Sequence, residues 1–204
     1  MQHDKELSTR IQQAGFAFHQ LHRRVFSDRN VGLHTKMCIY KAIVVPILIY
    51  GASESWAPTR AQLHQLDVFN NNCLRRILRE RLGPDALSNE ALHARTNQPD
   101  ISALLSTHRL RWLGHMGRLP DTSSVKRLLF ASAPAPVGQE GLLSRVRGGP
   151  SAAWNRVARA DIQTLSRLTQ HANAGLHTNE LTWLNNCQSR DAWRDLVSKC
   201  STVG

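Results

Sequence analysis

The sequence predicts an all-α protein: an irregular helical bundle, then a linker, then a small C-terminal helical segment. Two observations carry this prediction. Apolar residues recur at three- and four-residue steps in several stretches, which is the helical period, and no stretch alternates convincingly with period two. Hydrophobic residues make up 41% of the 204-residue chain, and aromatic residues only 6%. A core of Leu, Ile, Val and Ala is therefore expected.

The first predicted helix covers residues 4–28. Arg10 and Arg24 fall on its polar side, which is expected to face solvent. Its apolar stripe consists of Leu7, Ile11, Ala14, Phe18, Leu21 and Val25.

A second helix is expected over residues 33–52. Its apolar run fits either a buried strand or a buried helix, and its length of about twenty residues favours a helix. Pro46 should remove one hydrogen bond and kink it, and Gly51 is a suitable stop. Residues 38–50 are apolar all round, so they would form an uncovered apolar face if the chain were an interaction module or a relic without its covering domain.

The third helix is predicted over residues 59–82, with Thr59 as its N-cap and Gly83-Pro84 as its end. Ser88 should cap a short helix over residues 88–96. The apolar stripe of the third helix consists of Leu63, Leu66, Phe69, Cys73 and Ile77. Another face carries Asn72, Arg75 and Arg79.

A fourth helix should begin at Pro99-Asp100 and contain HRLRWLGHMGRLP, residues 108–120. Its inward side is expected to hold Ile101, Leu104, Leu105, Trp112 and Met116. The outward side is expected to hold Thr107, Arg111 and Arg118, with Arg109 at the border.

Residues 133–150 are rich in Ala, Pro and Gly, which is typical of a linker. The predicted organisation is therefore a bundle over 1–132, a linker over 133–150 and a helical segment over 151–204. Residues 154–168 are amphipathic again, and two short helical pieces close the chain.

The net charge is +11 and the pI is near 10.5, which favours an anionic partner, most often a nucleic acid. Residues 1–131 hold 18 Lys and Arg against 10 Asp and Glu, so the first two-thirds of the chain carries the candidate surface.

No catalytic site is predicted. The chain has no GxSxG, GxxxxGK[ST], HExxH or GxGxxG pattern, and no two acidic residues are adjacent. A two-metal site needs clustered carboxylates. No cofactor and no metal are expected, although a zinc-binding tail stays open as a weaker hypothesis. Its ligands would be His171, His177, Cys187 and Cys200, whose spacing fits no compact zinc knuckle.

The polar N-terminus and the four scattered cysteines favour reduced thiols in an intracellular protein that is not secreted. The apolar run at 38–52 is too short to span a bilayer, so no membrane association is expected.

Several blocks, taken in order, carry a family likeness. Residues 8–51 include Leu-x-x-Lys-x-x-x-Tyr-x-x-x-Val-x-Pro-x-Leu-x-Tyr-Gly, and residues 109–121 read RLRWLGHMGRLPD. The other blocks are CLRRIL at 73–78, SNEAL at 88–92, SRVRGGPSAAW at 144–154 and SRDAWRDLV at 189–197. Over about residues 4–200, the chain resembles the C-terminal thumb and post-thumb region of reverse transcriptases from LINE-type, non-LTR retrotransposons.

The chain departs from the pattern of this family at three places. Phe26 stands where the family more often has Trp, and ASESW has one residue more than the usual step. Ser151, Ala152 and Ala153 occupy a place that is usually basic.

The resemblance implies a non-catalytic piece of a transposable element, because the family's polymerase and endonuclease residues lie upstream of this region. It also implies that the thumb helices hold the template–primer backbone without sequence specificity. The expected partners are RNA, DNA or an RNA–DNA hybrid, and the palm domain of a parent reverse transcriptase. The protein would then work in a nuclear or cytoplasmic ribonucleoprotein.

Arginines at helical spacing are the candidate phosphate contacts, since guanidinium groups can bridge successive phosphates. The candidates are Arg75, Arg76, Arg79, Arg109, Arg111, Arg118, Arg145 and Arg147. Two alternatives stay open: a helical protein-interaction module and an orphan transposon relic, neither with a nucleic-acid role.

Overall fold

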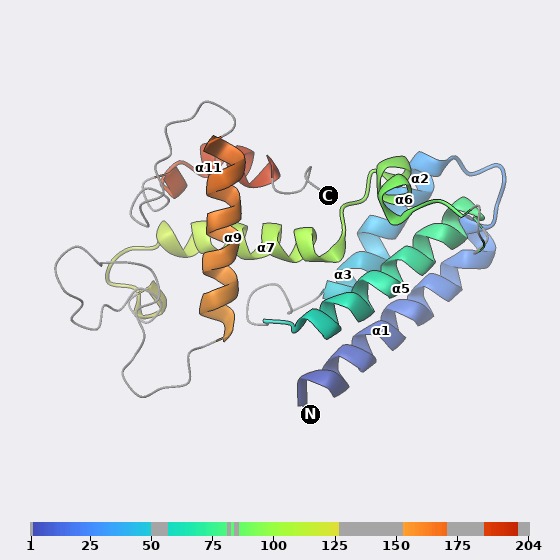
Figure 1. Cartoon of the computed structure of the whole chain (residues 1–204), viewed down its shortest axis with the longest axis horizontal. Coiled ribbons are helices and arrows are strands. Elements are labelled where there is room, and N and C mark those ends of the chain that lie inside the picture. The colour runs from blue at the N-terminus through green and yellow to red at the C-terminus, as the bar shows by residue number, and fades with distance from the viewer. Residues whose placement is uncertain are drawn as a thin grey trace. The chain divides into compact units, whose positions relative to one another are not determined.

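The computed structural model describes residues 2–49, 57–80, 83, 86–126, 153–170 and 186–199, and its regular secondary structure there is entirely helical (Figure 1). The predicted all-α class is confirmed. The chain divides into two compact units, the first mainly residues 1–53 and 58–105, the second mainly residues 106–203. The predicted boundaries at 132 and 150 lie outside the described residues. Within the described part, no helix is long and apolar enough to cross a membrane.

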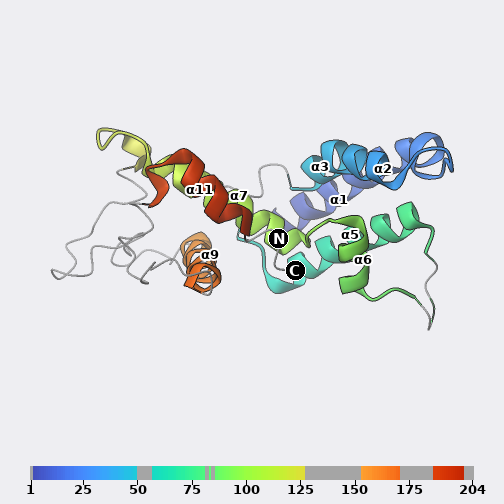
Figure 2. The ribbon, with the colours of Figure 1, turned by 90° about the horizontal axis from the view of Figure 1, so that it is seen from above.

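The first unit is built around a long helix, α1, which packs against α3 and α5 (Figures 1 and 2). The helices of this unit are α1 (Gln2–Leu21), α2 (Leu33–Ile39), α3 (Val45–Ile49), α5 (Arg60–Leu78) and α6 (Asn89–Thr96). Two π-helical turns, His22–Phe26 and Tyr40–Val44, follow α1 and α2 directly.

The first π-helical turn changes which residue enters the core. The backbone N–H of Ser27 donates to the carbonyl of His22 five residues earlier, so this turn holds one residue more than an α-helical turn. The apolar stripe therefore moves forward by one position. Phe26 is fully buried, whereas Val25, the predicted stripe residue, is only half-buried.

The second π-helical turn precedes Pro46. Pro46 has no N–H, and its ring crowds the carbonyl four residues earlier, so the regular α-helical pattern cannot run through it. The N–H of Val45 donates instead to the carbonyl of Tyr40. The irregularity predicted at Pro46 thus takes the form of a widened turn.

Aromatic rings fill the space between these turns. The rings of Phe18 and Phe26 stack with their centroids 4.9 Å apart, and Tyr40 meets both edge-on at 6.2 and 6.4 Å. The Tyr40 hydroxyl donates to Oδ1 of Asn70 on α5 at 2.8 Å. A buried Tyr needs such a partner, so this bond ties the second helical segment to α5.

The apolar face considered over residues 38–50 is only partly present. Five of its side chains are buried: Tyr40, Val44, Val45, Leu48 and Ile49. Ile43 is exposed, at 41% of its surface. The aromatic core and α1 lie against the buried side of this segment, whereas Cys38, Ala42 and Pro46 are exposed with Ile43.

Capping residues fix the ends of α5. Thr59 and Gln62 form a reciprocal capping box at its start, as the position of Thr59 predicted. The helix ends at Leu78, before the predicted stop at Gly83. Arg79 adopts a left-handed conformation with φ 61°, and the N–H of Glu80 donates to the carbonyl of Arg75.

Helix α7 (Ile101–Gly117) runs from the first unit into the second. Its predicted start is confirmed: Oδ1 of Asp100 accepts from the N–H of Ala103 at 2.6 Å, and Asp67 on α5 accepts from the N–H of Ile101 at 3.0 Å. The expected outward side is partly wrong, because Thr107 and Arg109 are buried.

In the second unit, more side chains of α7 are buried than the apolar pattern of α7 predicts. Helix α9 (Ala153–Gln170) crosses α7, and α11 (Arg190–Ser198) lies beside it (Figures 1 and 2). Their shared core consists of Leu110, Leu113, Ala158, Leu165, Cys187, Trp193 and Val197. Trp112 packs against it from the edge, and Leu105 and Met116 are buried, so the predicted inward side is confirmed at these positions.

Trp193 sets the distance between α11 and α7. Its indole Nε1 donates to the carbonyl of Leu110 at 2.8 Å. A Cβ atom added to Gly114 would lie 2.1 Å from the same nitrogen, far inside van der Waals contact. Only glycine leaves room for the indole at this crossing.

The change Gly114→Ala should therefore lower the free energy of unfolding of the second unit by about 1–3 kcal/mol, because the indole must leave its hydrogen bond. Urea denaturation followed by tryptophan fluorescence would measure the loss. Gly83→Ala is the control, since a Cβ there meets no atom within 4 Å. Equal stability of the two variants would contradict the packing argument.

The cysteines should differ in reactivity. Cys38 is exposed, whereas burial raises the pKa of Cys73 to about 12, which suppresses its thiolate. Alkylation with iodoacetamide at pH 8, followed by peptide mass spectrometry, should label Cys38 and spare Cys73 until the protein is unfolded in urea. Similar rates at both positions in the folded protein would refute this expectation.

Candidate nucleic-acid interface

The eight predicted arginines separate into three groups. Arg145 and Arg147 lie outside the described residues. The last turn and C-cap of α5, in the first unit, hold Arg75, Arg76 and Arg79. The helix α7 and the residue after it, in the second unit, hold Arg109, Arg111 and Arg118.

The three α5 arginines are held by groups without charge. Arg75 donates to the carbonyl of Leu87 and to Oδ1 of Asn89, both at 2.8 Å. The guanidinium of Arg76 lies over the ring of Phe18, 5.1 Å from its centroid.

Arg79 completes this set by donating to the backbone carbonyl of Ser27. Its partner, like those of Arg75 and Arg76, is a neutral group, which orients the guanidinium without cancelling its charge. Among the described residues, none of the three forms an ion pair. Their neighbour Arg95 differs, because it pairs with Glu80 at 3.2 Å.

Two histidines extend this group, which we call the α5-end cluster: Arg75, Arg76, Arg79, His19 and His22. Partial burial lowers the pKa of His22 below its usual value, and the positive charges of Arg76 and His19 lower it further. Burial is the larger cause, and the nearby positive charges add to it. Neither histidine is predicted from the sequence, since only the packing of α1 on α5 brings them to these arginines.

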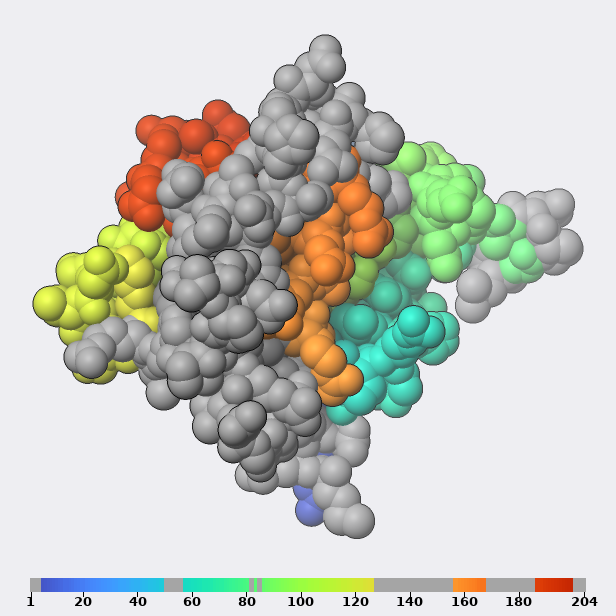
Figure 3. Space-filling model, turned by 60° about the vertical axis from the view of Figure 1, so that its left-hand side comes forward, coloured from blue at the N-terminus to red at the C-terminus, as the bar shows by residue number. Residues whose placement is uncertain are grey.

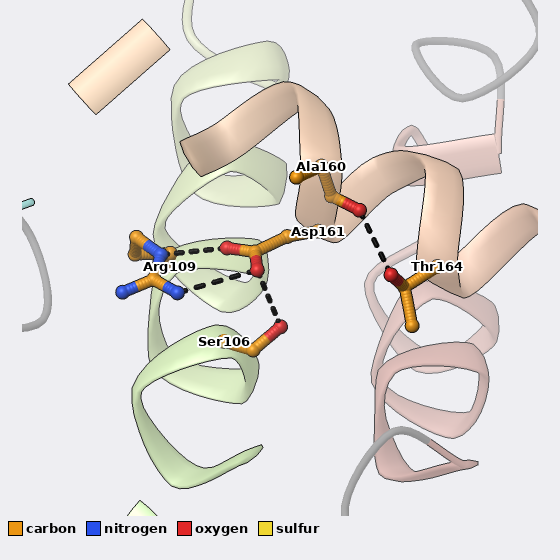
Figure 4. Close-up of polar contacts among 5 residues, drawn as sticks. All are labelled: Ser106, Arg109, Ala160, Asp161 and Thr164. Carbon is orange, nitrogen blue, oxygen red and sulfur yellow. Dashed lines mark hydrogen bonds and ion pairs between the residues drawn. The ribbon is translucent and has the colours of Figure 1, made fainter. Parts of the chain in front are cut away.

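Arg109 is buried and neutralised, which removes it from the candidate interface. Only 4% of its surface is exposed. Figure 4 shows its guanidinium against Asp161 of α9, with Nε at 2.6 Å from Oδ2 and Nη2 at 3.2 Å from Oδ1. Ser106 donates to the same carboxylate at 2.8 Å. A side chain enclosed in this way cannot reach a phosphate.

Two of the α7 arginines stay accessible. Arg111 and His115 are exposed, and Arg118 is half-buried with its Nη1 donating to the carbonyl of Cys187 at 2.7 Å. The three follow one another at steps of four and three residues, so they share one side of the helix. We call these three residues the α7 stripe. The hydrogen-bond partner of Arg118 is again a neutral carbonyl.

The zinc hypothesis gains no support from the described residues, in which no three His, Cys, Asp or Glu side chains gather at metal-binding distance. Cys187 is part of the core of the second unit, and burial raises its pKa. His171, His177 and Cys200 lie outside the described residues.

Comparison with known proteins finds no counterpart. No protein-family model matches the chain, and neither a curated protein nor a solved structure does so.

The Arg109–Asp161 pair should act on stability rather than on ligand binding. Its side chains are only 5% and 11% exposed. Arg109→Met should lower the free energy of unfolding by about 3–5 kcal/mol, because it leaves a buried carboxylate without its cation. Thermal and urea denaturation would measure the change.

The double variant Arg109→Met, Asp161→Leu should recover most of that stability, since it removes both buried charges. If Arg109→Met left stability unchanged and weakened nucleic-acid binding instead, this reading of the pair would be wrong.

Proposed function

We propose that this protein is a non-catalytic module that binds the backbone of RNA, DNA or an RNA–DNA hybrid without sequence specificity. The observation that carries the proposal is the α5-end cluster. Its arginines are oriented by neutral partners, and none of them forms an ion pair with a described residue. The likeness of the sequence blocks to the thumb region of LINE-type reverse transcriptases supports the same proposal.

Oriented guanidinium groups are well suited to contacting phosphates. A guanidinium held in place loses less side-chain entropy when it meets a phosphate, and it forms charge-assisted hydrogen bonds there. Backbone contacts of this kind position a nucleic acid but do not read its bases. The overall charge of +11 adds long-range attraction.

The α7 stripe offers a second set of phosphate contacts in the second unit. Arg111 is exposed, and Arg118 is steadied by the carbonyl of Cys187. His115 between them adds a further hydrogen-bond donor. With Arg109 paired inside the unit, the interface on α7 is this stripe alone.

Binding should show the salt dependence of phosphate contacts. Fluorescence anisotropy with a labelled RNA–DNA hybrid should give an affinity that falls linearly on a log–log plot against salt. The double variant Arg76→Gln, Arg79→Gln should flatten that slope by about 1.8, since each lost phosphate contact removes about 0.9.

Arg95→Gln is the matched control for the first unit, because Arg95 is already paired with Glu80 and should change the slope little. Absence of binding at low salt, or an affinity indifferent to salt, would reject the proposal.

A further inference from the structure

We propose that the outward side of α1 is a binding site for unpaired nucleotides, in which a base stacks on the ring of Phe16 and phosphates lie at His19 and Arg23. The inference rests on the proposed function and deepens it, because it names the form of nucleic acid that this side takes. None of the three residues belongs to the interface predicted from the sequence.

Phe16 is an aromatic residue that the core does not use. At 67%, it is the most exposed of the large apolar residues that the structure describes. The other exposed ones are aliphatic: Ile43, Val68 and Val125. Two positions further along the helix, Phe18 is only 1% exposed and stacks on Phe26. Packing within the first unit therefore accounts for the ring at position 18 but not for the ring at position 16.

The exposed neighbours of Phe16 on its side of the helix are polar or cationic. Four exposed residues follow one another at steps of four, three and four: Gln12, Phe16, His19 and Arg23. Such steps place them on one side of the helix. Arg23 belongs to the π-helical turn that follows α1 directly. We call these four residues the α1 row.

The α1 row runs into the α5-end cluster, because His19 belongs to both. Burial lowers the pKa of His22 most, and the positive charges of Arg76 and His19 lower it further, so these three side chains lie near one another. A strand whose phosphates meet the cluster can therefore extend its next nucleotides along the row to Phe16.

The chemistry of the row suits nucleotides that are not paired. Every base has a π face, so an aromatic side chain can stack on a base without reading its identity. Bases inside a duplex are stacked between their neighbours, whereas unpaired bases are free to lie on a protein ring. At 1.5 Å per residue, His19 and Arg23 are about 4.5 and 10 Å from Phe16 along the helix axis. Donors to phosphate thus flank the ring along the path of a strand.

A protein partner would need a different surface. Protein-docking patches are marked by contiguous apolar surface on the order of several hundred Å². Phe16 stands instead among exposed amide and imidazole side chains, those of Gln12, Gln13, His19 and Gln20. An aromatic ring beside cationic groups is typical of surfaces that hold single strands, so an unpaired stretch of RNA or DNA is the occupant we assign.

The test uses the full-length chain and labelled RNA–DNA hybrids that carry a short single-stranded overhang. One overhang has its bases, and the other has the same length and the same phosphates but abasic sugars. Fluorescence anisotropy should show that the wild-type chain binds the first about tenfold more tightly, which is the effect expected from stacking one base. Phe16→Leu should remove this difference, whereas Phe16→Trp should keep it.

Val125→Ala is the matched control, because it also shortens an exposed apolar side chain, 52% exposed, but lies in the second unit. Figure 3 shows the segment that follows α7, in yellow, at the surface of the molecule. This variant should keep the tenfold difference between the two overhangs. Circular dichroism of each variant confirms that it is folded.

The outcomes separate the two proposals. If the wild-type chain binds both hybrids equally, or if Phe16→Leu keeps the difference, the site on α1 is refuted and the proposed function stands. If the wild-type chain binds neither hybrid at low salt, both fall. Sedimentation should give the same association state for the wild-type chain and Phe16→Gln. A wild-type dimer that this change disrupts would make the face a contact between two copies and overturn the assigned occupant.

Discussion

The second unit depends on the contact between Trp193 and the backbone of α7. The indole lies where a side chain at position 114 would be, and it donates to the carbonyl of Leu110. The same contact joins two sequence blocks that lie far apart in the chain, RLRWLGHMGRLPD and SRDAWRDLV. The packing accounts for the glycine in the first block and the tryptophan in the second.

The partner of each arginine decides what that arginine can do. Carbonyls, an amide and an aromatic ring hold Arg75, Arg76, Arg79 and Arg118, and such groups orient a cation while leaving its field intact. A carboxylate holds Arg109, and the pair is neutral as a whole. A helical wheel cannot distinguish an arginine with a neutral partner from one with a carboxylate partner. The first can bind a polyanion and the second cannot.

Local signals predicted the fold class and several helix starts, because a cap depends on residues within one turn. Thr59, Ser88 and Asp100 cap as expected. Local signals could not predict the burial of Arg109, since its partner Asp161 lies 52 residues away in the sequence. One signal was present in the sequence: Asp161 interrupts the apolar stripe of α9, where an acid requires a buried cation.

The π-helical turn at His22–Phe26 should tolerate the loss of one residue better than the regular helical turns beside it. Because this turn holds one surplus residue, losing one residue there would tighten it into an α-helical turn and leave Phe26 on the apolar stripe, whereas a loss in a regular helical turn would rotate the later side chains by about 100°. A deletion at the π-helical turn would thus keep the ring of Phe26 on the side of Phe18. An alignment of this chain with any relative therefore needs freedom to place a one-residue gap at this point.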